Sequence, residues 1–256
     1  NQDGSLAWEY FVGDPVFASA ATGEDGTIYF GDEGGVFHAL NSDGSLKWTY
    51  ETEVISDTNN SILSSPAIDS LGNLYFGSGN GYCYSLSDNG DSGSLNWQYL
   101  TGDRVDSSPV LGLNDDVFFA GRDGYLRSLP TFSTTTENVA NWEVLVGDVF
   151  YSSPVVDSNG QVYVVAYAGG GDNHLFCYNN IGTKVWDSSE SNFPFTIDAV
   201  VDSSLALTND GTLLFGCYDS KLYAVSLSDG IADSDWPTLQ RSIKRDGAWP
   251  SYTVTL

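Results

Sequence analysis

Short runs of aromatic and aliphatic residues alternate with polar turns along most of the chain. One run covers residues 27–31 after Asp25-Gly26, and similar runs cover 73–77, 161–163 and 212–216 after turns of their own. Asp-Gly and Asn-Gly supply the positive φ angles of tight hairpins, while Val, Ile, Tyr and Phe suit a pleated sheet. The pattern therefore predicts antiparallel strands joined by hairpins.

A tryptophan recurs every 40 to 49 residues and divides the chain into similar units. The positions are Trp8, Trp48, Trp97, Trp142 and Trp186. Each unit opens with small residues, as in Ser64-Ser65-Pro66, and carries a further strand, such as 36–40, before the next tryptophan. Units of this length with four strands are typical of propeller blades. The predicted fold is an all-β, five-bladed β-propeller of four-stranded antiparallel blades.

The positions of the landmarks suggest where each strand lies in a blade. Small residues suit the innermost strand, because neighbouring blades converge at the axis and large side chains would collide there. The recurrent tryptophan suits the outermost strand, where its large apolar face can cover the seam between two blades.

The two ends of the repeat pattern complement one another. Residues 4–12 carry only an outer strand, whereas the unit that starts near residue 199 has only three clear strands. Pairing of the N-terminal strand beside 222–225 would close the ring and leave no open sheet edge. The predicted domains are a propeller over 1–235 and a C-terminal tail over 236–256 that packs on it. In the alternative, 229–236 forms a fifth outer strand and the chain is a piece of a larger ring.

The net charge narrows the possible partners. Thirty-four acidic residues against nine Lys and Arg give a formal charge of -25, which repels phosphate backbones and anionic lipid heads. No apolar stretch approaches the roughly 20 residues of a membrane-spanning helix. We expect no nucleic-acid partner, no membrane insertion, a monomer, and an extracellular or periplasmic location where acidity favours solubility.

The three scattered cysteines show no metal-ligand spacing and are expected to be buried.

The repeat resembles that of the pyrroloquinoline-quinone-like β-propellers, which include quinoprotein dehydrogenases and a propeller lipoprotein of bacterial outer-membrane protein assembly. The resemblance rests on the Ser-Ser-Pro openings, the strand Tyr75-Phe76-Gly77, the strand 222–225 and the Gly-Ser-Leu-x-Trp outer strands. The dehydrogenases of this group resemble one another in having about eight blades, a pair of adjacent cysteines and a calcium site. This chain has five units and no adjacent cysteines, so no quinone cofactor is expected and a non-catalytic bacterial member is predicted.

Candidate chemistry in the chain is sparse. The Asp-Gly pairs do not form a twelve-residue calcium loop and are explained by turn geometry, so bound calcium is possible but not indicated. Asp69, Asp157 and Asp202 take comparable positions in their blades and are expected to be structural turn residues. Asp106 and Asp198 stand just before first strands and could act as paired carboxylates of a glycosidase. His38 and His174 lack the partners of a zinc site.

The remaining candidates lie in loops that differ most from blade to blade. Loops that precede first strands and loops that join second to third strands gather at one mouth of a propeller channel, and variation on a fixed frame is typical of binding faces. The candidate ligand-binding residues are Arg104, Asp106, Arg122, Asp123, Asp148, Tyr151, Tyr167, His174 and Asp198. We predict a non-catalytic propeller that binds a protein or a glycan there. Alternatives are a carbohydrate-active enzyme and a sensor or adhesin module of a larger surface protein.

Overall fold

The computed structural model describes residues 4–55, 59–148, 151–167, 173–189 and 195–227, and all its regular elements there are β-strands. Blade 1 contains β1 (Ala21–Thr22), β2 (Ile28–Gly31), β3 (Val36–Leu40) and β4 (Leu46–Glu51). Blade 2 contains β5 (Ala67–Ile68), β6 (Asn73–Gly77), β7 (Tyr82–Asp88) and β8 (Gly93–Leu100). Blade 3 contains β9 (Val110–Leu111), β10 (Asp116–Ala120), β11 (Tyr125–Pro130) and β12 (Trp142–Leu145). Blade 4 contains β13 (Val155–Val156), β14 (Val162–Tyr167), β15 (Asn173–Tyr178) and β16 (Lys184–Asp187). Blade 5 contains β17 (Ala206–Leu207), β18 (Thr212–Gly216) and β19 (Leu222–Ser226).

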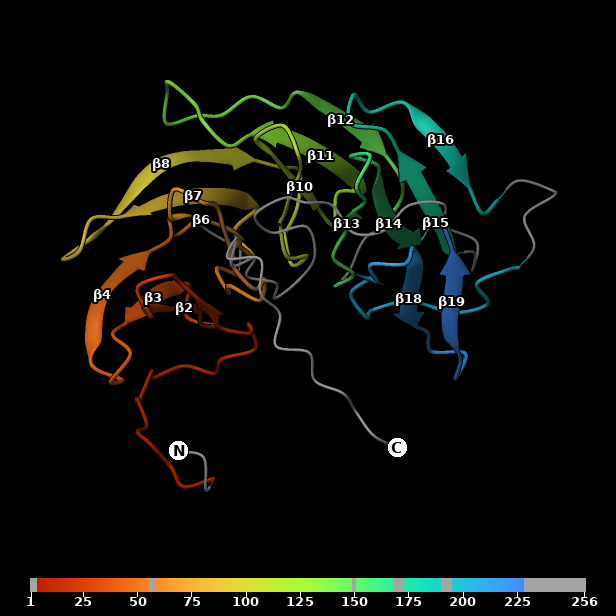
Figure 1. Ribbon diagram of the computed structural model, residues 1–256. Coiled ribbons are helices and arrows are strands. Elements are labelled where there is room, and N and C mark those ends of the chain that lie inside the picture. Colours follow the sequence, from red (N-terminus) through yellow and green to blue (C-terminus); the bar gives the residue numbers. More distant parts are fainter. Residues whose placement is uncertain (1–3, 56–58, 149–150, 168–172, 190–194, 228–256) are drawn as a thin grey trace.

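Each blade is an antiparallel sheet in which strands adjacent in sequence pair with one another. The blades follow one another around an arc, with the short first strands on the inner side and β4, β8, β12 and β16 on the outer side (Figure 1). The prediction of an all-β fold built from four-stranded antiparallel units is confirmed for four blades, and the described part of the fifth has three strands. No described helix is long and apolar enough to cross a membrane.

The hairpins between first and second strands adopt the predicted left-handed turns. Gly26, Gly72 and Gly160 have φ angles of 84°, 83° and 76°. Blade 3 lacks this glycine, and Asp115 takes its place with a φ of 55°. Aspartate is among the few residues that tolerate this conformation, so the turn is kept without the glycine.

The small-residue openings form a chain of hydrogen bonds between blades. The backbone N–H groups of Ser19, Ser65 and Ser108 each donate to the hydroxyl of the corresponding serine in the next blade, namely Ser65, Ser108 and Ser153, at 2.9 Å. We call these contacts the serine belt. The openings therefore supply hydroxyl groups that link neighbouring blades, a role that steric reasoning alone did not predict.

The outer-strand tryptophans cover the seams as predicted. Trp48 of β4 donates its indole N–H to Asp88 Oδ1 of blade 2 at 2.9 Å. Trp97 of β8 donates to the Thr131 carbonyl of blade 3 at 2.8 Å, and Trp142 of β12 donates to the Asn180 carbonyl of blade 4 at 2.9 Å. Each described contact joins one blade to the next, so the tryptophans lock neighbouring sheets together.

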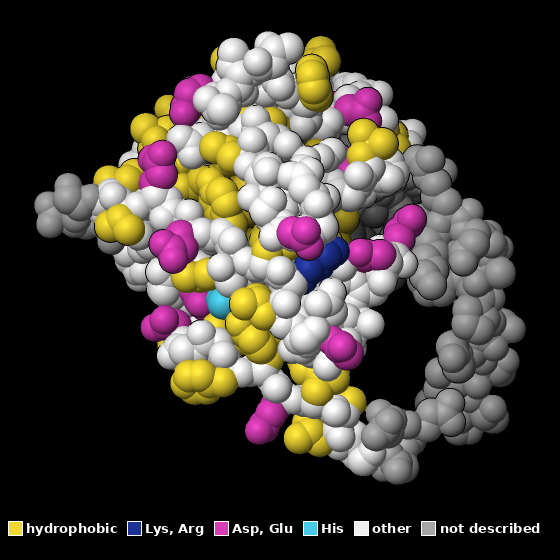
Figure 2. Space-filling model, turned by 90° about the vertical axis from the view of Figure 1, so that its left-hand side faces the viewer, with side chains coloured by type: hydrophobic (Ala, Val, Ile, Leu, Met, Phe, Trp, Pro, Cys, Tyr) yellow, Lys and Arg dark blue, Asp and Glu magenta, His cyan; other side chains and the backbone are white. Residues whose placement is uncertain are grey.

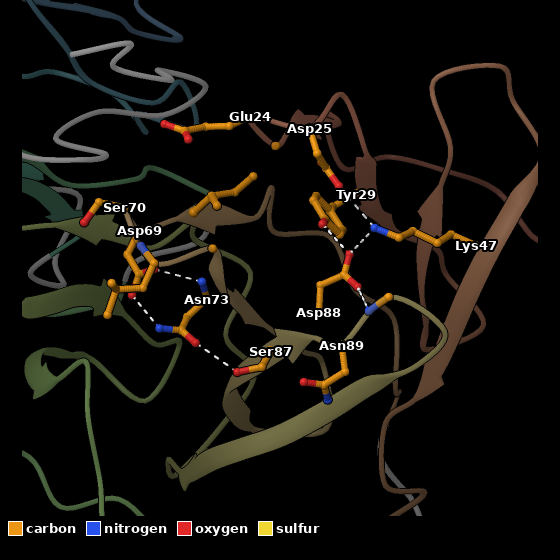
Figure 3. A pocket seen from close by; sticks show the side chains of 15 residues that line it. Glu24, Asp25, Tyr29, Lys47, Asp69, Ser70, Asn73, Ser87, Asp88 and Asn89 are labelled. Carbon is orange, nitrogen blue, oxygen red and sulfur yellow. Dashed lines mark hydrogen bonds and ion pairs between the residues drawn. The ribbon is translucent and has the colours of Figure 1, made fainter. Parts of the chain in front are cut away.

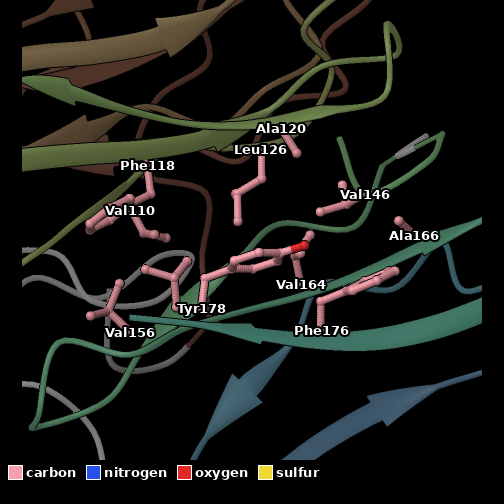
Figure 4. Packing of buried hydrophobic residues seen from close by; sticks show 11 residues of the cluster. Val110, Phe118, Ala120, Leu126, Val146, Val156, Val164, Ala166, Phe176 and Tyr178 are labelled. Atoms are coloured by element: carbon pink, nitrogen blue, oxygen red, sulfur yellow. The ribbon is translucent and has the colours of Figure 1, made fainter. Parts of the chain in front are cut away.

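The hydrophobic cores also lie between blades. One cluster joins Phe118 and Leu126 of blade 3 to Val164, Phe176 and Tyr178 of blade 4 (Figure 4). The other clusters combine blades 1 and 2, blades 2 and 3, and blades 4 and 5. A single blade thus cannot bury its apolar faces alone, which is the general logic of repeat architectures.

Residues 4–12 form no strand, and the structure does not confirm closure of the ring. Two of their side chains nevertheless contact blade 1 in the way that the outer strand of a preceding blade would. The Trp8 indole donates to the Ser42 carbonyl at 3.1 Å, and the Tyr10 ring meets His38 edge-on with centroids 6.1 Å apart. Tyr50 meets Tyr84 of the next blade in the same way at 6.3 Å. The alternative strand 229–236 and the predicted tail 236–256 lie outside the described residues.

Candidate functional site

Two sets of loops meet at one end of the blades, as expected for a propeller mouth. Within blade 3, the N–H of Arg122 in the β10–β11 turn donates to the carbonyl of Arg104 in the loop before β9 at 2.9 Å. Between blades, the Val105 N–H donates to the Ser78 carbonyl in the β6–β7 turn at 3.1 Å. We call this end the mouth. Its loops are held by backbone hydrogen bonds, so their side chains project from a rigid base.

A chain of polar side chains crosses the mouth from blade 2 to blade 4. The Asp106 carboxylate is buried between two guanidinium groups: Arg104 Nη2 lies 3.1 Å from Oδ1, and Arg122 Nε lies 2.6 Å from Oδ2. Arg104 Nη2 also donates to Ser61 Oγ at 3.2 Å. The Arg122 guanidinium lies 5.1 Å from the centroid of the Tyr151 ring. These five residues are the mouth cluster.

The mouth cluster presents positive charge and an aromatic ring. Two guanidinium groups surround one carboxylate, so one formal positive charge remains on a strongly acidic protein. Burial lowers the pKa of Arg122, but the interactions of its guanidinium with Asp106 and Tyr151 together outweigh this effect and raise it. The side chains of Arg104 and Arg122 are about one quarter exposed, and Tyr151 is 43% exposed. Arg and Tyr are the residue types that most often anchor protein partners.

The residue directly before each small-residue opening differs from blade to blade. The five equivalent positions are Phe17, Leu63, Asp106, Tyr151 and Asp202. Phe17 is largely exposed. The sequence analysis did not select it, because its equivalence to Asp106 and Tyr151 becomes visible only when the blades are aligned by their structure. The same register corrects the interpretation of Asp202, which occupies the position of Asp106 and not that of Asp69 or Asp157.

Asp123 lies beside the mouth but is engaged in an ion pair. The Arg127 guanidinium binds both of its oxygens, one at 2.9 Å and the other at 2.5 Å. The N–H of Gly102 also donates to Asp123 at 2.9 Å. Arg127 is buried and lies over the ring of Tyr99 from blade 2. Asp123 therefore neutralises a buried cation at a seam.

The other predicted site residues pair with residues outside the mouth cluster. Asp148 and Tyr167 pair through two backbone hydrogen bonds of 2.8 and 2.9 Å. His174 lies on β15 opposite Ala166. Asp198 is exposed, and it accepts hydrogen bonds from Thr196 and Lys221 that lower its pKa. The structure thus brings together four predicted residues, Arg104, Asp106, Arg122 and Tyr151, and adds Ser61 from the preceding blade.

Asp69 and Asp157 have the structural turn role predicted for them. Asp69 Oδ1 accepts the N–H groups of Leu71 and Asn73, and its Oδ2 accepts the Tyr75 hydroxyl. Asp157 makes the same contacts in blade 4, including one from the Tyr163 hydroxyl. Within the described ranges, no three His, Cys, Asp or Glu side chains gather as metal ligands would.

The sheets, the serine belt and the mouth define a β-propeller with a loop-built face. The family model described as outer membrane protein assembly factor BamB matches residues 1–149. The chain belongs to this family of pyrroloquinoline-quinone-like propellers, and the resemblance seen in the sequence is confirmed.

Three solved structures are similar in fold. The crystal structure of BamB from Moraxella catarrhalis is 19% identical, covers 93% of this chain and 79% of its own, and has a TM-score of 0.56. Saccharomyces cerevisiae Sqt1 is 14% identical over 83% of this chain and 60% of its own, with a TM-score of 0.65. A chain of the mitotic checkpoint complex is 14% identical over 82% of this chain and 61% of its own, with a TM-score of 0.62. No curated protein matches the chain. At these identities the similarity concerns the fold alone.

Proposed function

We propose that this protein is an interaction propeller that binds a protein partner across its mouth. The mouth cluster carries the proposal, because it joins partly exposed Arg side chains and an exposed Tyr side chain from adjacent blades on a rigid base. The family description, that of an assembly factor, supports a role in contacting other proteins. The same description, with its reference to the outer membrane, supports the periplasmic or extracellular location.

The geometry favours binding over glycoside hydrolysis. Both Asp106 oxygens are engaged by arginines, and the carboxylate is buried. The pKa of Asp198 is lowered, which is the wrong direction for a general acid. The two carboxylates also belong to separate clusters. A pair that faces one glycosidic bond is thus not supported by their surroundings.

Binding at the mouth can be tested with peptides selected by display against the intact protein. Arg122→Ala and Tyr151→Ala should each weaken a selected peptide at least about tenfold, since anchor residues contribute about 1.4 kcal/mol or more. Fluorescence anisotropy measures the dissociation constants. Lys184→Ala is the matched control, because Lys184 is a half-exposed cation next to the β15–β16 turn at the end opposite the mouth, and this change should leave affinity unchanged.

Other outcomes would redirect the proposal. Equal weakening by Lys184→Ala would indicate general electrostatics and overturn the assignment to the mouth. Selection of glycans instead of peptides on an array would favour the carbohydrate alternative, and turnover of such a glycan would contradict a binding-only role.

We also propose that residues 4–12 form the outer strand of blade 5 and close the ring. The support is the repeated register: Ala39 pairs with Trp48, and Ser85 pairs with Trp97. The segment around Trp8 has the same Leu-x-Trp-x-Tyr sequence and the same contacts on blade 1. By this register Trp8 would lie opposite Ala224, and Glu9 opposite Tyr223.

The closure is tested by a cysteine pair at Glu9 and Tyr223 in a Cys217→Ser background. Directly opposed residues have Cβ atoms about 5 Å apart, so a disulfide within one chain should form under mild oxidation and appear in mass spectrometry. Each single variant is the control. A disulfide between two chains, or none, would contradict closure within one molecule.

A further inference from the structure

A polar groove lies at the seam of blades 1 and 2, at the end opposite the mouth. It has a volume of about 610 Å³ and is formed by the hairpin turns that join first to second strands and third to fourth strands. Figure 3 shows Glu24, Asp25 and Lys47 on one side and Asp69, Asn73 and Asn89 on the other, with Asp88 and Tyr29 between them. Turns of these two kinds meet at the end away from the mouth because the strands are antiparallel.

Two residues in the first hairpin turn of blade 1 differ from their counterparts in blades 2 and 4. Asp69 and Asp157 bind the tyrosine hydroxyl of their own blade, but blade 1 has Gly23 there, and the Tyr29 hydroxyl donates instead to Asp88 of blade 2 at 2.6 Å. The next residue is Glu24, where blades 2 and 4 have Ser70 and Ser158 and blade 3 has the larger, apolar Leu113.

The glycines that face Leu113 and Glu24 across their seams show the effect of having leucine or glutamate at this position. A methyl group at Gly160 would lie 3.8 Å from Leu113 Cδ1, so the leucine covers the seam between blades 3 and 4. A methyl group at the equivalent Gly72 would meet no atom within 4 Å. The seam between blades 1 and 2 is therefore open at the position where Leu113 fills the seam between blades 3 and 4.

The inner wall of the groove has its hydrogen bonds satisfied. Asp88 accepts from the Trp48 indole, the Gly90 N–H, the Tyr29 hydroxyl and the Lys47 ammonium. Lys47 Nζ donates to Asp88 at 2.8 Å, to Thr27 at 2.9 Å and to Asp25 at 3.3 Å. An ammonium has three donors, so Lys47 has none left for a ligand.

The groups in the groove that can still accept hydrogen bonds are carboxylates at its rim. Asp25 accepts three hydrogen bonds, and a carboxylate can accept about four. Glu24 is exposed and makes no hydrogen bond or ion pair with any residue that the structure describes. The lining carries four carboxylates against one ammonium, and the charged side chains on the face shown in Figure 2 are mainly acidic.

These facts define the chemistry of a ligand. It must donate hydrogen bonds and carry positive charge, since Glu24 and Asp25 have acceptor capacity left and the Lys47 ammonium has no donor left. A single metal ion is disfavoured, because no metal-binding group is found among the described residues. A sugar would need an exposed aromatic platform, and the lining aromatic ring, Tyr29, is buried.

We propose that this groove is a second binding site, which receives an arginine or lysine side chain of a basic protein segment. Glu24 and Asp25 bind the cation at the rim, and Gly72 leaves room for its aliphatic stem. The site is distinct from the mouth and does not depend on the function proposed for it.

The test uses fluorescein-labelled tetra-arginine, with tetra-glutamate as the reversed-charge peptide. Glu24→Leu copies the blade 3 residue, removes the free carboxylate and covers Gly72, so it should weaken tetra-arginine binding five- to tenfold in anisotropy. Glu51→Gln is the control, because Glu51 is an exposed acid of β4 that does not line the groove. Arg122→Ala should leave tetra-arginine binding unchanged, which separates this site from the mouth.

Backbone amide shifts locate the peptide independently of affinity. Binding should shift Gly72, Asn89 and Gly90 in the wild type and fail to do so in Glu24→Leu. Equal losses in Glu24→Leu and Glu51→Gln, or shifts that spread over all acidic loops, would show general charge attraction and overturn the proposal. Binding of tetra-glutamate with similar affinity would also overturn it.

Discussion

Replacement of Trp97 by alanine is expected to lower the free energy of unfolding by about 3–5 kcal/mol, the usual cost of removing a large buried aromatic side chain. Trp97 is fully buried against Tyr75, and its indole N–H bonds to the Thr131 carbonyl across the seam of blades 2 and 3. The change therefore removes packing within one blade and a tie to the next. Urea denaturation followed by circular dichroism measures the loss.

Phe132→Ala provides the matched control for this experiment. Phe132 is 77% exposed, so its loss should change stability by no more than about 0.5 kcal/mol. If both variants are equally stable, the tryptophans do not hold the seams. Trp142 is only partly buried at the next seam, and Trp142→Ala should fall between the two.

Replacement of Asp123 by alanine should cost about 3 kcal/mol, because it leaves the buried Arg127 without its main counter-charge. Glu143 lies 3.3 Å from Arg127 but is half exposed, so it can compensate only in part. The double variant Asp123→Ala/Arg127→Met should recover a large share of the loss, since it removes the uncompensated cation as well. Chemical denaturation of the two singles and the double gives the coupling.

The contribution of Asp123 should also depend on pH in one direction. Burial raises the pKa of this carboxyl, but the hydrogen bonds and charge of Arg127, together with backbone N–H donors such as that of Gly102, outweigh burial and lower it. A lowered pKa in the folded state means that the stabilisation is present above the unfolded value of about 3.9 and is lost as pH falls through the folded value. The stability difference between wild type and Asp123→Ala should be constant from pH 7 to about 5 and shrink below about 4. A difference that persists unchanged at lower pH would contradict the ion pair.

Much of the sheet architecture can be predicted from the sequence, because the patterns that specify turns and strands involve residues close together in the chain. Hairpin turns, strand periods and the tryptophan spacing depend on neighbouring residues, and the structure confirms them. The roles of Asp69 and Asp157 were predictable for the same reason, since their partners lie within six residues. The serine belt was missed because each hydroxyl meets a backbone N–H some 45 residues away.

The candidate site was predictable only at the level of loops. Reasoning from the sequence selected Arg104, Asp106, Arg122 and Tyr151, but it could not show that Asp106 is buried between two arginines from the same blade. In the sequence, Asp123 could not be distinguished from the neighbouring loop candidates. Its role depends on the ion pair with Arg127, four residues further along the chain. Asp202 was placed wrongly because its blade departs from the Ser-Ser-Pro pattern, which left the register open.

The serine belt has a consequence for how such a molecule can change in size. Every described link of the belt is formed by one serine hydroxyl and the equivalent serine N–H one module away. Duplication of a whole module would reproduce both the donor and the acceptor at each new junction, so the gene could gain or lose a copy without the need for a compensating substitution elsewhere. Evolution of ring size in this architecture would then be limited by curvature at the hub and not by the chemistry of the joints.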